Sequence, residues 1–173
     1  MGEVPENRLN DRPNGQAGLD RFDRAILAVL AAEGRISTVE LARRVGLSKT
    51  PVQARMRRLE RDGVIVGYRA MLSARRLNRA HLAFVQIRLT DTREAALQAF
   101  NRAVLAIPEI EECHMIAGGF DYLLKVRTED IGAYRQVMAE RLSALPHVAA
   151  TSTFVVMEAV KDTASLAWGE GPR

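Results

Sequence analysis

The residues of this sequence best suited to chemistry lie between Lys49 and Arg61, where hydroxyl, amide and guanidinium groups recur at helical spacing. A helix turns about 100° per residue, so the apolar Val52, Met56 and Leu59 share one face and leave the other face polar. Amide and guanidinium groups can read base edges, while basic groups neutralise phosphates. We therefore predict contacts with base edges and with phosphates. The predicted base contacts are Thr50, Gln53, Ala54 and Arg57, and the predicted phosphate contacts are Lys49, Arg58 and Arg61.

The flanking residues predict two short helices joined by a tight turn. Ser37 and Glu40 have the spacing of a capping box, and Gly46 suits the left-handed position that ends a first helix at Val45. Ser48 is suited to cap the second helix, and Pro51 falls in its first turn, where a missing N–H costs little. This order of caps, turn and basic helix predicts a helix-turn-helix.

A third helix is predicted from Leu19 to Ala32, with Asp20 as its N-cap. The segment from Val64 to Leu72 looks extended, so the unit resembles a small winged helix. The apolar residues predicted to pack the three helices together are Phe22, Ile26, Val29, Leu30, Leu41, Ala42, Val45, Leu47, Val52, Met56 and Leu59.

Charge is distributed unevenly along the chain. Residues 19–79 carry fourteen Lys or Arg against six Asp or Glu, a net +8, whereas residues 80–162 carry eight against eleven, a net −3. The basic part contains the predicted helix pair, so a polyanion is the expected partner of the first domain. The connection with Arg69, Arg75, Arg76 and Arg79 fits either a phosphate contact or a solvated linker.

The second half predicts the order β-α-β-β-α-β. Strands are expected at residues 82–89, 109–117, 121–128 and 151–160. Helices are expected after a capping box at residues 91–94, continuing to Ile107, and at residues 131–145. This order is that of the ferredoxin-like sandwich. The predicted class is α+β, with a disordered arm (1–18), a helix-turn-helix domain with a linker strand (19–79), a ferredoxin-like domain (80–162) and a tail (163–173).

Strand patterns also predict an oligomer. One face of the first strand carries Ala83, Val85, Ile87 and Leu89, yet Leu82 and Phe84 lie on the other, and apolar residues fill both faces of residues 154–160. A sheet covered by helices on one side only should alternate apolar and polar residues. A second subunit is therefore expected to cover the second face, and two-fold pairing would present two recognition helices to successive major grooves.

Other function classes have weaker support. The histidines, His81, His114 and His147, are scattered, and neither metal-ligand spacing nor a phosphate-binding glycine loop occurs, so an enzyme and a metal site are not expected. An RNA-recognition sheet would need exposed aromatics, for which Phe84 and Tyr122 are the candidates. An architectural DNA-packaging protein without an effector remains an alternative.

The chain is also expected to work in the cytoplasm, on the nucleoid. No apolar run approaches the roughly 20 residues of a membrane span, and no signal-peptide pattern opens the sequence. The single cysteine, Cys113, cannot form an internal disulfide and fits a buried position in a strand.

Long segments of the chain resemble the Lrp/AsnC family of bacterial transcription regulators, in its leucine-responsive and proline-catabolism branches. They are LDRFDRAIL, GRISTVELARRVGLSKTP, RRLERDGVIVGY, IEECHMIAGGFDYLLKVRTEDIGAYR and TFVVMEAVKD, which together extend from Leu19 to Asp162. The resemblance places a helix-turn-helix on Thr38 to Arg57, and adds Thr38 and Ser48 to the expected DNA contacts. It implies a homodimer, joined through the C-terminal sheets, that assembles into tetramers or octamers.

The resemblance further implies an amino-acid effector bound at a contact between dimers, and no other cofactor. Asp121 would accept from the ligand ammonium, free N–H groups around Gly118 and Gly119 would meet its carboxylate, and Met115, Ile131 and Phe154 would line an apolar slot. The remaining implied positions are Tyr122, Val155 and Val156. The residues alone also allow a simpler role for Asp121, a hydrogen bond to nearby backbone in a tight turn. Leucine-responsive members resemble GDFDY here, whereas this chain has GGFDY with Gly119 in place of the first acid, which leaves leucine, proline and other amino acids open.

Overall fold

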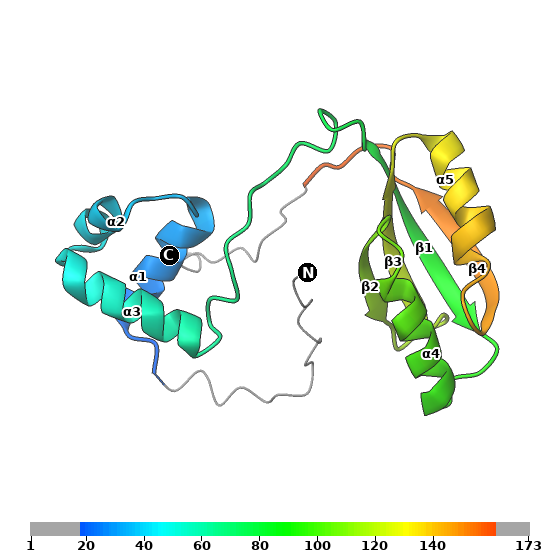
Figure 1. The fold of residues 1–173 in the computed structure, drawn as a ribbon, viewed down its shortest axis with the longest axis horizontal. Coiled ribbons are helices and arrows are strands. Elements are labelled where there is room, and N and C mark those ends of the chain that lie inside the picture. The colour runs from blue at the N-terminus through cyan, green and yellow to red at the C-terminus, as the bar shows by residue number, and fades with distance from the viewer. Residues whose placement is uncertain (1–17, 162–173) are drawn as a thin grey trace. The chain divides into compact units, whose positions relative to one another are not determined.

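The computed structural model describes residues 18–161, and predictions for residues 1–17 and 162–173 lie outside these described residues. The described chain divides into two compact units, residues 18–71 and residues 72–161 (Figure 1). The division falls earlier in the chain than the predicted boundary at residues 79 and 80. Each unit has its own hydrophobic core.

The N-terminal unit is a bundle of three helices, α1 (Arg21–Ala32), α2 (Thr38–Val45) and α3 (Lys49–Arg61). Asp20 is the N-cap of α1, as predicted, and Gly46 ends α2 at φ 69°, in the left-handed region that glycine adopts without strain. Ile26, Leu41 and Val52 are fully buried where the helices meet. The predicted helix-turn-helix and most of its apolar core are confirmed. Phe22 is the exception, because its ring lies outside this core, with its centroid 4.6 Å from the Arg21 guanidinium carbon.

Three details of this unit differ from the prediction. Ser37 Oγ accepts from the Glu40 N–H at 3.2 Å, but the Glu40 carboxylate bonds to Arg43 and Arg44 instead of returning to the cap. Ser48 occupies the N-cap of α3 without a side-chain cap hydrogen bond. Residues 64–72, where a linker strand is expected, pair with no other strand among the described residues.

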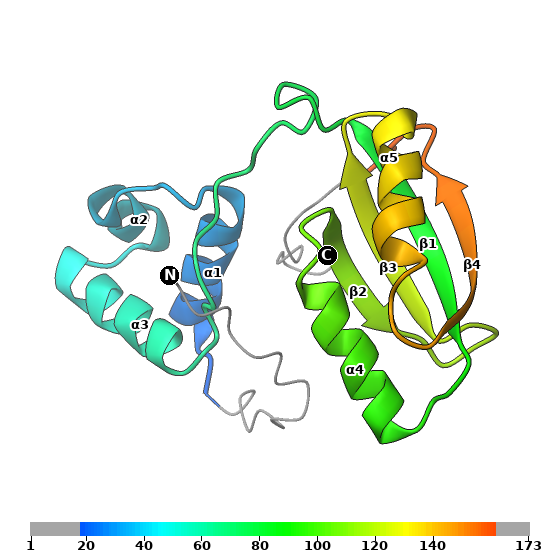
Figure 2. The same cartoon turned by 45° about the vertical axis from the view of Figure 1, so that its right-hand side comes forward.

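The C-terminal unit is an antiparallel sheet of β1 (His81–Leu89), β2 (Ile110–Met115), β3 (Tyr122–Thr128) and β4 (Val148–Val155), in the order β2-β3-β1-β4. The helices α4 (Glu94–Leu105) and α5 (Ile131–Val137) lie on the same face of this sheet (Figures 1 and 2). Val85, Ile87 and Leu124 are fully buried beneath them. The predicted ferredoxin-like topology is confirmed.

Several element boundaries were predicted wrongly. The Asp91 carboxylate bonds to Arg93 instead of capping a helix, so α4 begins only at Glu94. The predicted final helix is α5 followed by a short π-helical turn, η1 (Met138–Leu142). The final strand ends at Val155 instead of Val160. Its partner β1 begins at His81, so after the Val156 N–H has bonded to Leu82 O, at 2.9 Å, little of β1 is left to pair with residues 157–160.

The sheet face away from the helices is mixed rather than wholly apolar. Phe84 lies opposite both Phe154 and Lys125, and Gln86 lies opposite Leu123 and Ser152. Residues 156–160, which were expected to extend the apolar pattern, follow the end of β4. The half-exposed Phe154 still leaves apolar surface on this face. None of the helices in the described part of the chain has the length and apolarity needed to cross a bilayer.

Burial predicts that Cys113 is chemically inert. Its side chain packs against the core beside β3, and burial raises the pKa of the thiol to about 11 from 9.0. Since the thiolate is the reactive species, we expect alkylation by iodoacetamide at pH 8 to be about 100-fold slower in the native protein than in urea. Mass spectrometry against time measures both rates. Equal rates would contradict the assigned burial.

Candidate nucleic-acid interface and ligand site

An exposed polar stripe runs along α3 on the side away from the bundle core. Thr50, Ala54, Arg57 and Arg61 are exposed and, at about 100° per residue, fall within about 60° of arc. The buried Val52 and Leu59 lie on the opposite side of the helix. The α3 surface therefore has the form that a major groove admits.

The other predicted DNA contacts border this stripe. Ser48 and Lys49 are exposed at the start of α3, and Gln53 is half-buried on its flank. Thr38 is half-buried in the first turn of α2. Arg58 differs from the other predicted DNA contacts, because its guanidinium points toward α1 and not along the exposed stripe.

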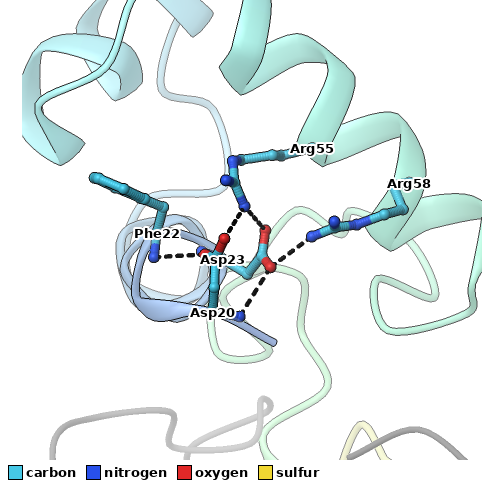
Figure 3. Close-up of polar contacts among 5 residues, drawn as sticks. All are labelled: Asp20, Phe22, Asp23, Arg55 and Arg58. Atoms are coloured by element: carbon cyan, nitrogen blue, oxygen red, sulfur yellow. Dashed lines mark hydrogen bonds and ion pairs between the residues drawn. The ribbon is translucent and has the colours of Figure 1, made fainter. Parts of the chain in front are cut away.

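A buried carboxylate joins α3 to α1. The Asp23 side chain is fully buried and accepts from Arg55 Nη1 at 2.8 Å and from Arg58 Nη2 (Figure 3). Arg55 Nη1 also donates to Asp20 Oδ2 at 2.6 Å, and the backbone N–H of Asp20 donates to Asp23 Oδ2 at 3.1 Å. We call Asp20, Asp23, Arg55 and Arg58 the α1–α3 clamp. Its charge-assisted bonds are of the stronger class of hydrogen bond, and they fix how α3 sits on α1.

The hydrogen bonds of the clamp shift the pKa values of Arg55 and Asp20. Hydrogen bonds to Asp23 and then to Asp20 raise the pKa of Arg55, so the guanidinium stays charged. The backbone N–H of Asp23, together with Arg55, lowers the pKa of Asp20. The prediction assigned Arg58 to phosphate and gave Arg55 no role. The signal that could have identified the clamp is the pair of i, i+3 spacings, Asp20 with Asp23 and Arg55 with Arg58.

Helix α2 carries a separate, exposed charge cluster. Hydrogen bonds from Arg43, then from Arg44, lower the pKa of Glu40 to about 2, so the carboxylate remains ionised across the physiological range. Both arginines are thereby paired within their own helix. On α3, by contrast, Lys49 and Arg57 are exposed and available to a polyanion.

The second candidate site is the turn between β2 and β3, residues 116–121. Asp121 Oδ2 accepts from the Leu89 N–H at 2.7 Å, at the point where the β1–β4 register shifts. The Asp121 N–H donates to Ile87 O at 2.9 Å, and Asp121 O accepts from the Ile116 N–H at 2.8 Å. Asp121 thus secures the turn to the end of β1, and its Oδ1 has no hydrogen-bond partner among the described residues.

The glycines of this turn leave room around it. A Cβ placed on Gly119 would meet no atom within 4 Å, and one on Gly118 would make only an ordinary contact, at 3.5 Å with Ile116. The backbone N–H groups of Gly118 and Gly119 bond to no other described residue. Arg88 Nη2 donates to Gly119 O at 3.1 Å, a contact that the sequence prediction missed.

Of the remaining predicted ligand residues, only Met115 has its side chain near this turn. Tyr122 is buried in the core, with its ring centroid 4.4 Å from that of Phe100, so only its backbone can line the site. Met115 lies opposite Tyr122 and is exposed near the turn. The burial of Tyr122 also removes one of the two aromatics that an RNA-binding sheet would use.

Strand register places the other four predicted residues toward the opposite end of the sheet. Val155 lies opposite Ala83, and Phe154 and Val156 adjoin it. Ile131, which is exposed, follows the strand end at Thr128, which pairs with His81. The turn instead contacts Ile87 and Leu89, so at about 3.3 Å per residue the two groups are separated by roughly 13 Å along β1.

No group of His, Cys, Asp and Glu within the described residues could hold a metal ion.

Comparison with known proteins gives two family matches along the chain. Residues 19–66 match the model described as winged helix-turn-helix DNA-binding, and residues 82–166 match the Lrp/AsnC ligand binding domain. The proline dehydrogenase transcriptional activator of Rhodobacter capsulatus is 63% identical over 142 residues, covering 82% of this chain and 92% of the relative.

Two further comparisons agree with these. The leucine-responsive regulatory protein of Escherichia coli strain K12 is 51% identical over 145 residues, covering 84% of this chain and 88% of that protein. A crystal structure of a transcriptional regulator of Neisseria meningitidis in complex with L-methionine aligns with a TM-score of 0.82 and 32% identity. That alignment covers 86% of this chain and 96% of that one.

The α1–α3 clamp predicts a stability difference between two aspartates. Asp23→Asn removes the buried negative charge and leaves two arginines facing a neutral amide, so we expect a loss of about 2–3 kcal/mol in the free energy of unfolding. This is below the usual cost of breaking a buried pair, because both arginines are partly exposed and can be hydrated. Urea denaturation measures the loss.

Asp62→Asn is the matched control, because within residues 18–161 the exposed Asp62 side chain pairs only with its exposed neighbour Arg61. The control should change the free energy of unfolding by less than about 0.5 kcal/mol. Equal losses in the two variants would show that the clamp does not hold α3 in place.

Proposed function

The chain belongs to the Lrp/AsnC family of DNA-binding transcription regulators, and we propose that it controls genes of amino-acid catabolism, proline dehydrogenase among them, in response to a small amino acid. The observation that carries the ligand part is the Asp121 carboxylate, held with one oxygen free beside an open glycine turn in the matched ligand-binding domain. The protein would act in the cytoplasm, on the DNA it regulates.

On the DNA side, the proposal assigns base contacts to Thr50, Gln53, Ala54 and Arg57. Lys49 and Arg61 would approach phosphates from either end of α3. The exposed stripe supports this assignment, since its arginines are free of the clamp. Arg58 is reassigned: its first partner is Asp23, so its contribution to DNA binding would come from orienting α3.

On the ligand side, the zwitterion of an amino acid matches the chemistry of the turn. The free Oδ1 of Asp121 would accept from the ammonium, and the unpaired N–H groups of Gly118 and Gly119 would donate to the carboxylate. The bond from Leu89 to the other carboxylate oxygen would hold Asp121 in place for this task.

The apolar half of the site would come from a second copy of the chain. Within one copy, Ile131 and Phe154 lie roughly 13 Å or more along the sheet from the turn, further than a small amino acid extends. A contact between copies that brings the turn of one against residues 154–156 of another would complete the site. Ligand binding would then alter how the copies associate, and with it the spacing of their recognition helices. We propose a homodimer that assembles into a tetramer or octamer.

Proline is the first candidate effector and leucine the second. The support for proline is the identity with the proline dehydrogenase activator, and the support for leucine is the lower identity with the leucine-responsive protein. The L-methionine complex of the Neisseria regulator supports an amino-acid ligand in general. An architectural protein without an effector is the alternative, and only a ligand response separates the two.

Arg57 provides the test of the DNA surface. Because Arg57 lies at the centre of the exposed stripe, we expect Arg57→Ala to weaken binding to a selected operator by roughly 1–3 kcal/mol, with a smaller effect on random duplex. Fluorescence anisotropy at fixed salt measures both affinities. Arg102→Ala, an exposed arginine on α4, is the control. Undiminished discrimination between operator and random DNA would refute the assignment.

Asp121 provides the test of effector binding. A ligand that binds only the folded state raises the melting temperature, so a thermal-shift screen of all twenty amino acids should show a selective rise with one or two of them. Asp121→Asn should abolish that rise while keeping the fold, because the amide oxygen can still accept from the Leu89 N–H. Glu140→Gln, an exposed acid beyond α5, is the control.

No rise with any amino acid, either alone or with bound operator, would favour the architectural alternative. A normal rise in Asp121→Asn would move the site elsewhere.

A further inference from the structure

The turn at residues 116–121 lies beside a positive charge that no sequence motif marks. The Arg88 side chain is the last on β1 before the register shift, and its Nη2 donates to Gly119 O at 3.1 Å. The next residue, Leu89, donates its N–H to Asp121 Oδ2 at 2.7 Å. Two adjacent residues of β1 therefore bond to this turn. Arg88 brings a guanidinium group to Gly119, and Leu89 holds the Asp121 carboxylate.

We propose that Arg88 is a ligand-binding residue of this site and that its guanidinium binds the carboxylate of the amino acid. The inference rests on the proposed function and adds a specificity: the site selects a free α-carboxylate, so amides, esters and peptide-linked amino acids are rejected. Asp121 would accept from any protonated amine, and the neutral N–H groups of Gly118 and Gly119 could donate to an amide oxygen as well as to a carboxylate, so these groups do not by themselves select a free carboxylate.

Arg88 has the capacity for this role. A guanidinium has five N–H donors in a planar fork, and the Gly119 carbonyl occupies one of them. Arg88 is exposed, so the remaining donors are open to a bidentate pair with a carboxylate. The bond to Gly119 O limits the movement of the side chain, which lowers the entropic cost of binding.

The glycines make the same surface accessible. A side chain at Gly119 would project into space that is empty to 4 Å, beside the carbonyl that Arg88 contacts. Its absence leaves that carbonyl, the guanidinium and the unpaired Gly118 and Gly119 N–H groups open to one small anion. An acidic residue at position 119 would instead compete with the ligand carboxylate for Arg88.

The test compares each amino acid with its carboxamide. L-proline, L-leucine and L-methionine are titrated calorimetrically into the full-length protein, each beside L-prolinamide, L-leucinamide or L-methioninamide, at about pH 6.5 so that both ammonium groups stay protonated. In the unsubstituted protein we expect the acid to bind at least about tenfold more tightly than the amide. In Arg88→Gln that ratio should fall to about twofold or less, chiefly because the acid weakens.

Arg88→Lys, which keeps the charge but not the fork, should recover part of the ratio. Arg102→Gln, an exposed arginine of α4, should leave the ratio unchanged. Melting temperatures measured without ligand check that every variant is folded.

The measurements distinguish failure of the proposed function from failure of the role proposed for Arg88. If only another amino acid of the twenty binds the unsubstituted protein, that amino acid and its amide are compared instead. If none of the twenty binds, either alone or with bound operator, the proposed function fails and this inference fails with it. If amino acids bind and the acid-to-amide ratio survives Arg88→Gln, the effector site stands and Arg88 is not its carboxylate partner. If Arg88→Gln weakens acid and amide equally, Arg88 acts only by shaping the turn, and the inference is overturned.

Discussion

The geometry of the DNA-binding unit depends on one fully buried carboxylate. Asp23 receives two guanidinium groups from α3 and one backbone N–H from its own helix cap, so a single side chain fixes the start of α1 and the orientation of α3. A buried ion pair is not in itself evidence of high stability, since desolvation offsets much of the attraction. Its contribution here is directional, because hydrogen bonds from two guanidinium groups restrict the orientation of α3 more narrowly than the apolar contacts of Val52 and Leu59 do. The orientation of the exposed stripe follows from that constraint.

In the ligand-binding unit the corresponding constraint is the bond between Asp121 and Leu89. It occurs where the β1–β4 register shifts, and the side-chain oxygen supplies a partner for the N–H of Leu89 there. The carboxylate therefore has a structural role and still presents a second oxygen. The simple interpretation, in which Asp121 bonds to nearby backbone, and the functional one are compatible, because a residue already held in place loses little freedom when it binds a ligand.

The sequence was sufficient to predict the helices and strands, because caps, turns and apolar periodicity depend on residues that are close together in the chain. Asp20, Gly46 and the β-α-β-β-α-β order were all predictable on that basis. Hydrogen bonds between side chains and their partners could not be predicted in the same way. The sequence cannot show that Asp91 bonds to Arg93 instead of capping α4, that Arg58 turns to Asp23, or that Arg88 reaches Gly119. Tyr122 illustrates the same limit: the family resemblance placed it among the ligand positions, whereas strand alternation directs its ring into the core.

The register of the sheet connects these observations to regulation. Since Asp121 contacts one end of β1 and residues 154–156 border the other, a single copy holds the polar and apolar halves of the proposed site apart. A ligand that needs both halves binds the assembled form better than the separate copies, and by reciprocity it must favour assembly. The same ligand need not touch the DNA-binding unit to affect it. Any change in how copies associate changes the separation of their recognition helices, and DNA presents its major grooves only at fixed helical intervals.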